Sequence, residues 1–128
     1  MEDRAEIEKI IKLTLIRIGI KCDMIGFVYL EKAIEFVVES PFYVYNLKDL
    51  FKAVADFFGV KNPYRVEANI QNAISATYDL RGFDAINEIF HMEVFEAKRK
   101  PSTAELIKLI AEYYKLKLYE VEKSMLGI

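Results

Sequence analysis

Apolar residues recur at helical spacing along most of the chain, in segments that glycine and proline separate. Over residues 4–18 one side of a helix carries Ile7, Ile10, Ile11, Thr14 and Ile18, which predicts an amphipathic helix ending at Gly19. Residues 27–40 repeat the pattern as far as Pro41, which ends the helix because it cannot donate a backbone hydrogen bond. Alternating apolar and polar runs, typical of strands, are few. The pattern therefore predicts an all-α fold.

Capping signals frame a pair of helices in the middle of the chain. Asn46 is a good N-cap for a helix that ends at Gly59, and Asn62 followed by Pro63 is a typical start for the next helix. Two helices joined by a short turn containing glycine have the layout of a helix-turn-helix unit, placed here at about residues 46–80. Helical bundles also contain such pairs, so the spacing alone leaves an ordinary packed pair open.

The last third of the chain has a less regular pattern. Residues 84–91 predict a short helix, whereas residues 92–100 lack helical spacing and are expected to be extended or a loop. Ser102 or Thr103 is expected to cap a final helix, with a C-terminal extension at about residues 116–128. The chain of 128 residues is thus predicted to be a single domain, a compact bundle of about six helices.

The second helix of the central pair has two chemically different faces. Its apolar face consists of Val66, Ile70, Ala73, Ile74, Thr77 and Tyr78. The opposite face is small, polar and nearly uncharged, with Arg65, Asn69 and Asn72 flanked by Gln71 and Glu67. Arginine recognises guanine, asparagine and glutamine recognise adenine, and glutamate accepts from cytosine in the major groove. The face predicts a DNA-reading surface, although it equally suits close packing against another protein.

Composition narrows the class of protein further. With 53% apolar residues the chain can bury a core, which excludes global disorder. The net charge of −2 does not mark the chain as a strongly basic nucleic-acid binder. The single cysteine, Cys22, excludes an intrachain disulfide and favours the cytoplasm, where we expect this cysteine to be buried and unreactive. The sequence has no uncharged apolar run long enough to predict a membrane helix.

Six segments together carry a resemblance to a known family. They are Ile18-Gly19-Ile20, residues 25–34 (IGFVYLEKAI), Tyr64-Arg65-Val66-Glu67, Ala73-Ile74, Arg81-Gly82 and residues 98–105 (KRKPSTAE). Over about residues 7–116 the chain resembles the C-terminal effector domain of the stage-zero sporulation master regulators, which are response-regulator transcription factors of endospore-forming bacteria. The resemblance implies a helical domain that binds double-stranded DNA in the major groove through a helix-turn-helix. The receiver domain of the family has no counterpart in the 128 residues.

The resemblance also implies roles for individual residues. Arg65 and Glu67 match family positions that contact bases, so we expect Arg65 to read guanine and Glu67 to read cytosine or to orient Arg65. Lys98 and Lys100 match a basic segment before the last helix, to which this chain adds Arg99. These three residues, with Lys61, are expected to hold phosphates, while Asn69, Gln71 and Asn72 read or approach adenines.

The chain departs from the family along the recognition helix, where Ala68, Gln71 and Asn72 replace basic residues. Residues 61–82 carry a net charge of only +1, which becomes +4 if residues 98–100 fold onto the same side. A single subunit with so few phosphate contacts should bind DNA weakly, so a homodimer, another regulator or RNA polymerase is an expected partner. The alternative is a protein-interaction module that keeps the fold, has lost DNA binding and acts on a regulator or the transcription machinery.

Candidates for other chemistry are weak. Asp84, Glu88 and His91 have spacing that suits a metal ligand set, but His91 is the only histidine and the second pair that such sites need is missing. Neither a nucleophile–base pair nor a glycine-rich phosphate loop occurs. We therefore expect no enzyme activity, no metal site and no cofactor. The aromatic run at residues 42–45 is either core with a packed loop or an interaction surface.

Overall fold

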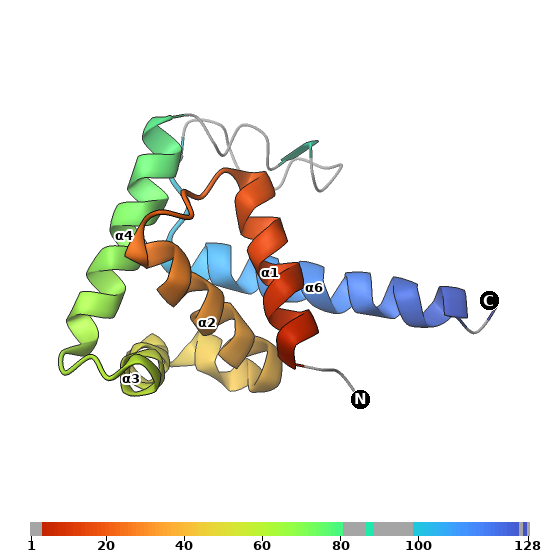
Figure 1. The fold of residues 1–128 in the computed structure, drawn as a ribbon, viewed down its shortest axis with the longest axis horizontal. Helices are drawn as coiled ribbons and strands as arrows, with labels where there is room; N and C mark the ends of the chain where they lie inside the picture. The colour runs from red at the N-terminus through yellow and green to blue at the C-terminus, as the bar shows by residue number, and fades with distance from the viewer. Residues whose placement is uncertain (1–3, 81–86, 89–98, 126, 128) are drawn as a thin grey trace.

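Helices form all the regular structure in the part of the chain that the computed structural model describes, residues 4–80, 87–88, 99–125 and 127. In order they are α1 (Arg4–Ile18), α2 (Ile25–Glu39), the 3-10 helix η1 (Pro41–Tyr45), α3 (Leu47–Phe58), α4 (Pro63–Asp79) and α6 (Thr103–Met125) (Figure 1). These described residues contain no strand, which confirms the all-α prediction. They hold five α-helices rather than about six, because the helix predicted at residues 84–91 lies outside them except for positions 87 and 88.

Helix α2 lies at the centre of the bundle, where α1, α4 and α6 pack around it (Figure 1). Ten of its fifteen residues are buried, whereas an amphipathic surface helix would bury a single stripe. Leu30 and Ile34 are completely buried, as are Ile11 and Leu15 of α1 and Ile110 of α6. One continuous core therefore holds every helix through contacts with α2.

The predicted capping residues occupy the predicted places. The side chain of Asn46 accepts a hydrogen bond from the backbone N–H of Asp49 at 3.3 Å, and Asn62 Oδ1 accepts from the N–H of Tyr64 at 3.0 Å. Gly59 ends α3 with φ of 71°, a left-handed conformation that favours glycine. Local sequence therefore determines where α3 ends and where α4 begins.

Gly26 allows α2 and α4 to approach each other closely. A Cβ atom at this position would collide with the backbone oxygen of Asn69 and would lie 2.8 Å from the Cβ of Ala73. Glycine is therefore required near the start of α2 for α4 to reach its observed position. The small Ala73, which is itself fully buried, completes the contact from the other side.

Three charged residues of α2 lie inside the bundle, which the sequence pattern did not predict. Glu31, Lys32 and Glu35 are all buried, and Lys32 Nζ lies 2.9 Å from Glu35 Oε2 and 4.3 Å from the centre of the Phe57 ring. Among the described residues, Glu31 Oε2 has no hydrogen-bond partner. Burial, followed by hydrogen bonding to Glu35 and repulsion from its charge, raises the pKa of Glu31 to about 8. The Glu31 carboxyl therefore retains its proton at neutral pH.

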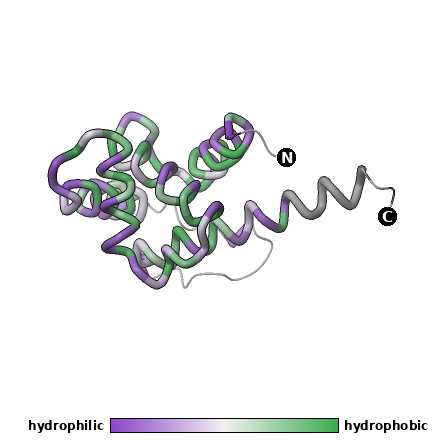
Figure 2. The backbone as a smooth tube through the Cα atoms, turned by 90° about the horizontal axis from the view of Figure 1, so that it is seen from below, coloured by the Kyte–Doolittle hydropathy of each residue, from purple (hydrophilic) through white to green (hydrophobic). Residues whose placement is uncertain are grey.

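The C-terminal half of α6 leaves the bundle and projects away from it (Figure 1). The predicted C-terminal extension is therefore helical and continues α6 without a break to Met125. Along the rest of the backbone, hydrophilic and hydrophobic residues alternate within the helices, as expected when one side of a helix is buried (Figure 2). Cys22 is exposed in the α1–α2 connection, so the prediction of a buried cysteine is wrong: the connection runs over the surface. Among the described residues, no helix combines the length and apolar character needed to cross a bilayer.

Substituting Gly26→Ala should lower the free energy of unfolding by at least about 2 kcal/mol, because the added methyl group forces α2 away from the backbone of α4. Urea denaturation monitored by circular dichroism measures this change. Ile25→Ala serves as the control, because Ile25 is half exposed and its truncation leaves the helix contact intact. An equal loss in the two variants would contradict the close approach at Gly26.

Substituting Glu31→Gln should change how stability depends on pH. A carboxyl group whose pKa rises from 4.5 to about 8 on folding makes the native state lose stability as pH rises between these values. Glutamine does not titrate, so the variant should exceed the parent by up to about 4–5 kcal/mol near pH 9 and match it near pH 5. Denaturation at both pH values tests this, and a difference that is independent of pH would contradict it.

Candidate nucleic-acid interface

The candidate interface is built on α3, α4 and the turn at residues 59–62 between them. The buried face of α4 consists of Val66, Ile70, Ala73, Ile74 and Thr77, as the sequence predicted, while Tyr78 is only partly buried. This face packs against α2 and α3. The opposite face of α4 therefore points away from the core.

The predicted polar residues lie on this outer face. Arg65, Gln71 and Asn72 are exposed, and Lys61 is exposed in the turn just before the helix. Glu67 is half-buried, and its Oε1 accepts a hydrogen bond of 3.4 Å from Gln71 Nε2. The face thus carries one arginine, a paired glutamate and glutamine, and an open asparagine amide.

Asn69 differs from its polar neighbours. Its side chain is half-buried, and Nδ2 donates a hydrogen bond of 2.7 Å to the backbone oxygen of Arg65, one turn earlier. This amide is therefore held along its own helix, next to the residue that the sequence analysis expects to read guanine. The periodicity places Asn69 correctly on α4 but does not reveal this bond.

A hollow of about 570 Å³ lies beside the start of α4. Tyr29 of α2 forms one wall, the turn at residues 59–62 forms another, and Arg65 and Asn69 of α4 complete it. The Tyr29 ring also packs against Phe58 at the end of α3, with 5.5 Å between ring centres. The first turn of α4 therefore borders a concave surface.

Part of the predicted basic segment lies next to α4. Lys100 Nζ donates a hydrogen bond of 3.0 Å to Ser75 Oγ, which brings this lysine to the C-terminal half of α4. Arg99 instead forms two hydrogen bonds with Glu105, at 3.1 and 2.7 Å, which lower the pKa of that carboxyl. Lys98 lies outside the described residues. The fold thus adds a positive charge to the α4 face, while Arg99 is engaged by α6.

Ser102 caps α6 through reciprocal bonds with Glu105. The N–H of Glu105 donates to Ser102 Oγ at 3.1 Å, and the N–H of Ser102 donates to Glu105 Oε1 at 3.4 Å. The cap is therefore the first of the two predicted candidates, Ser102. Because Glu105 also holds Arg99, this motif fixes the segment that carries Lys100 relative to the start of α6.

A family model for the sporulation initiation factor Spo0A C terminal matches residues 11–114. The match covers most of the chain, including all of α2, α3 and α4 and about half of α6. The chain belongs to this family. The Spo0A C-terminal match stops before the projecting end of α6.

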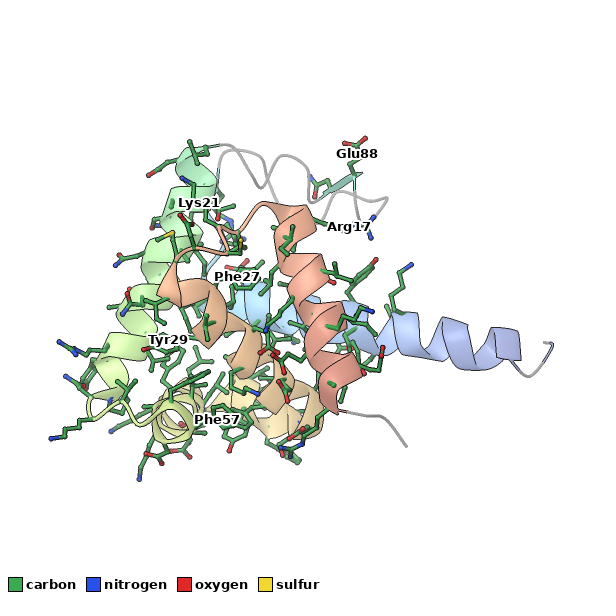
Figure 3. All side chains as sticks on the ribbon, viewed as in Figure 1. Arg17, Lys21, Phe27, Tyr29, Phe57 and Glu88 are labelled. Atoms are coloured by element: carbon green, nitrogen blue, oxygen red, sulfur yellow. The ribbon has the colours of Figure 1, made fainter. Side chains whose placement is uncertain are left out.

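The sequence analysis of this Spo0A C-terminal domain did not single out Tyr64 as a candidate contact. Tyr64 is 72% exposed in the first turn of α4, directly before Arg65. Helical periodicity could have revealed it, because it places Tyr64 off the apolar face of α4. Of the alternative metal set, Asp84 and His91 lie outside the described residues, and Glu88 is exposed (Figure 3).

Replacing Asn62 with alanine should cost about 1 kcal/mol of stability, because α4 loses the side-chain acceptor for an N–H of its first turn. Asn72→Ala is the matched control, since Asn72 is exposed in the interior of the same helix, where alanine is the better helix former. Thermal unfolding compares the two variants. Equal stability of N62A and N72A would show that the cap does not define the start of α4.

Proposed function

We propose that the chain is a sequence-specific DNA-binding regulator of transcription that inserts α4 into the major groove. The observation that carries this proposal is the outer face of α4, which is polar, exposed and held outward by a fully buried reverse side. Membership of the Spo0A C-terminal family supports it, because that family consists of sporulation initiation factors. In this proposal α3, the turn and α4 act as a helix-turn-helix.

Each residue of the face has a chemical role in the proposal. Arg65 donates to the O6 and N7 atoms of guanine, and Asn72 pairs with the edge of adenine. Glu67 and Gln71 are hydrogen-bonded to each other. In the proposal Glu67 accepts a hydrogen bond from cytosine and Gln71 pairs with adenine. Asn69 donates a hydrogen bond to the backbone oxygen of Arg65, and in the proposal it contacts a base only after this bond breaks.

Basic residues at both ends of α4 supply the phosphate contacts. Lys61 precedes the helix and Lys100 lies against its second half, so the two amines lie at opposite ends of the outer face of α4. In the proposal Lys98 and Arg99 also contact DNA phosphates. Arg99 does so by breaking its hydrogen bonds with Glu105. Three to four phosphate contacts give a slope of about −3 in a plot of log affinity against log salt concentration. Such a subunit needs a second copy or a partner to hold DNA firmly at physiological salt.

A second candidate function is a protein-interaction module. A groove of about 600 Å³ runs between the starts of α3 and α4, with Leu47, Phe51 and Tyr64 among its lining residues. The Phe42 and Tyr45 side chains of η1 are each more than 80% exposed. Exposed aromatic rings near an apolar groove favour a protein partner, and a chain that binds no duplex DNA at low salt would support this candidate.

Arg65→Ala should weaken binding to a duplex selected from a random pool by about 1–3 kcal/mol, because a bidentate contact to guanine is lost. Fluorescence anisotropy at low salt measures the affinity. Lys9→Ala is the control, since it removes one positive charge from an exposed position of α1 far from this face in the sequence. The proposal fails if both variants bind like the parent, or if both lose the same affinity.

A further inference from the structure

We infer that Glu8, Glu31 and Glu35 form a binding site for a hard divalent cation such as calcium, between α1 and α2. One carboxylate oxygen from each residue lies within 4.8 Å of the other two. Glu8 comes from α1, while Glu31 and Glu35 are one turn apart on α2. The site is separate from the α4 face and does not depend on the proposed DNA binding.

The second observation that supports the site is the Glu31 side chain itself. This residue is 2% exposed, and its Oε2 atom has no hydrogen-bond partner within the described parts of the chain. An unsatisfied buried acceptor destabilises a protein unless a donor or a cation reaches it. A cation between the three carboxylates would give the buried Glu31 carboxylate a ligand-type partner that the described residues do not supply to Oε2.

The nearby lysines leave room for a ligand. Lys12 Nζ lies 2.6 Å from Glu8 Oε1 and Lys32 Nζ lies 2.9 Å from Glu35 Oε2, so each amine engages one oxygen of its partner. Two ammonium groups against three carboxylates leave one negative charge in excess when all five are ionised. The Lys12 side chain is partly exposed and can turn to solvent, whereas Lys32 is held beneath the Phe57 ring.

The donor set and its spacing define the type of cation. Three carboxylates without sulfur or imidazole suit a hard, oxygen-seeking ion. Three carboxylates whose oxygens lie within 4.8 Å of one another suit calcium, which takes many oxygen ligands in a flexible geometry, better than magnesium, which usually keeps several waters and binds through one or two carboxylates. The half-exposed Glu8 leaves one side of the site open to water, which completes the coordination of calcium.

Thermal unfolding of the full chain, at pH 7 and at pH 9, tests the site with calcium chloride against sodium chloride of equal ionic strength. We expect about 10 mM calcium to raise the Tm by about 3 °C. Glu8→Gln and Glu31→Gln should abolish this shift, and Glu6→Gln, an exposed neighbour on α1, should retain it. Lys12→Met should respond at a lower calcium concentration, because a competing cation is gone. Magnesium should produce a smaller shift.

Three results would overturn the site. If the parent chain shows no shift, a proton alone neutralises the cluster. If Glu31→Gln responds as strongly as the parent, calcium acts elsewhere on the surface. If magnesium equals calcium, the preference of the site for calcium is wrong. Glu8→Gln keeps the test decisive even if the buried Glu31 variant folds poorly, because Glu8 is only half-buried.

Discussion

The contact between α2 and α4 at Gly26 is the constraint on which the rest of the structure depends. It places the backbone of α4 directly on the central helix, which contacts each of the other described helices. Because the buried side of α4 is fixed there, its opposite side is presented to solvent at a defined angle. The side chains of that outer face are then free to serve recognition, since folding makes little use of them.

Local features of the fold were predictable from sequence, and features that depend on distant partners were not. The caps at Asn46 and Asn62 and the stripe starting at Val66 follow from residues close together in the chain, and the structure confirms them. The burial of Glu31 was missed, because a helix surrounded on nearly all sides has no single apolar stripe to reveal it. The pairing of Arg99 with Glu105 depends on how the last loop meets α6, which periodicity does not describe.

In the candidate site, too, local features were predictable from sequence and contacts between distant residues were not. Sequence placed Arg65, Gln71 and Asn72 on one exposed face, and the structure agrees because helical geometry alone determines it. It did not show that Asn69 bonds to its own helix or that Lys100 reaches Ser75. Because Glu105 engages Arg99, the structure places less unpaired positive charge beside α4 than the sequence analysis expected.

The most direct test of the central claim is to follow backbone amide resonances while duplex DNA is added at low salt. The DNA-binding account predicts shifts concentrated in the turn at residues 59–62, along the outer face of α4 and at Lys100, with α1 unaffected. Shifts that gather instead on η1 and the exposed rings of Phe42 and Tyr45, or a spectrum that DNA does not change, would contradict it.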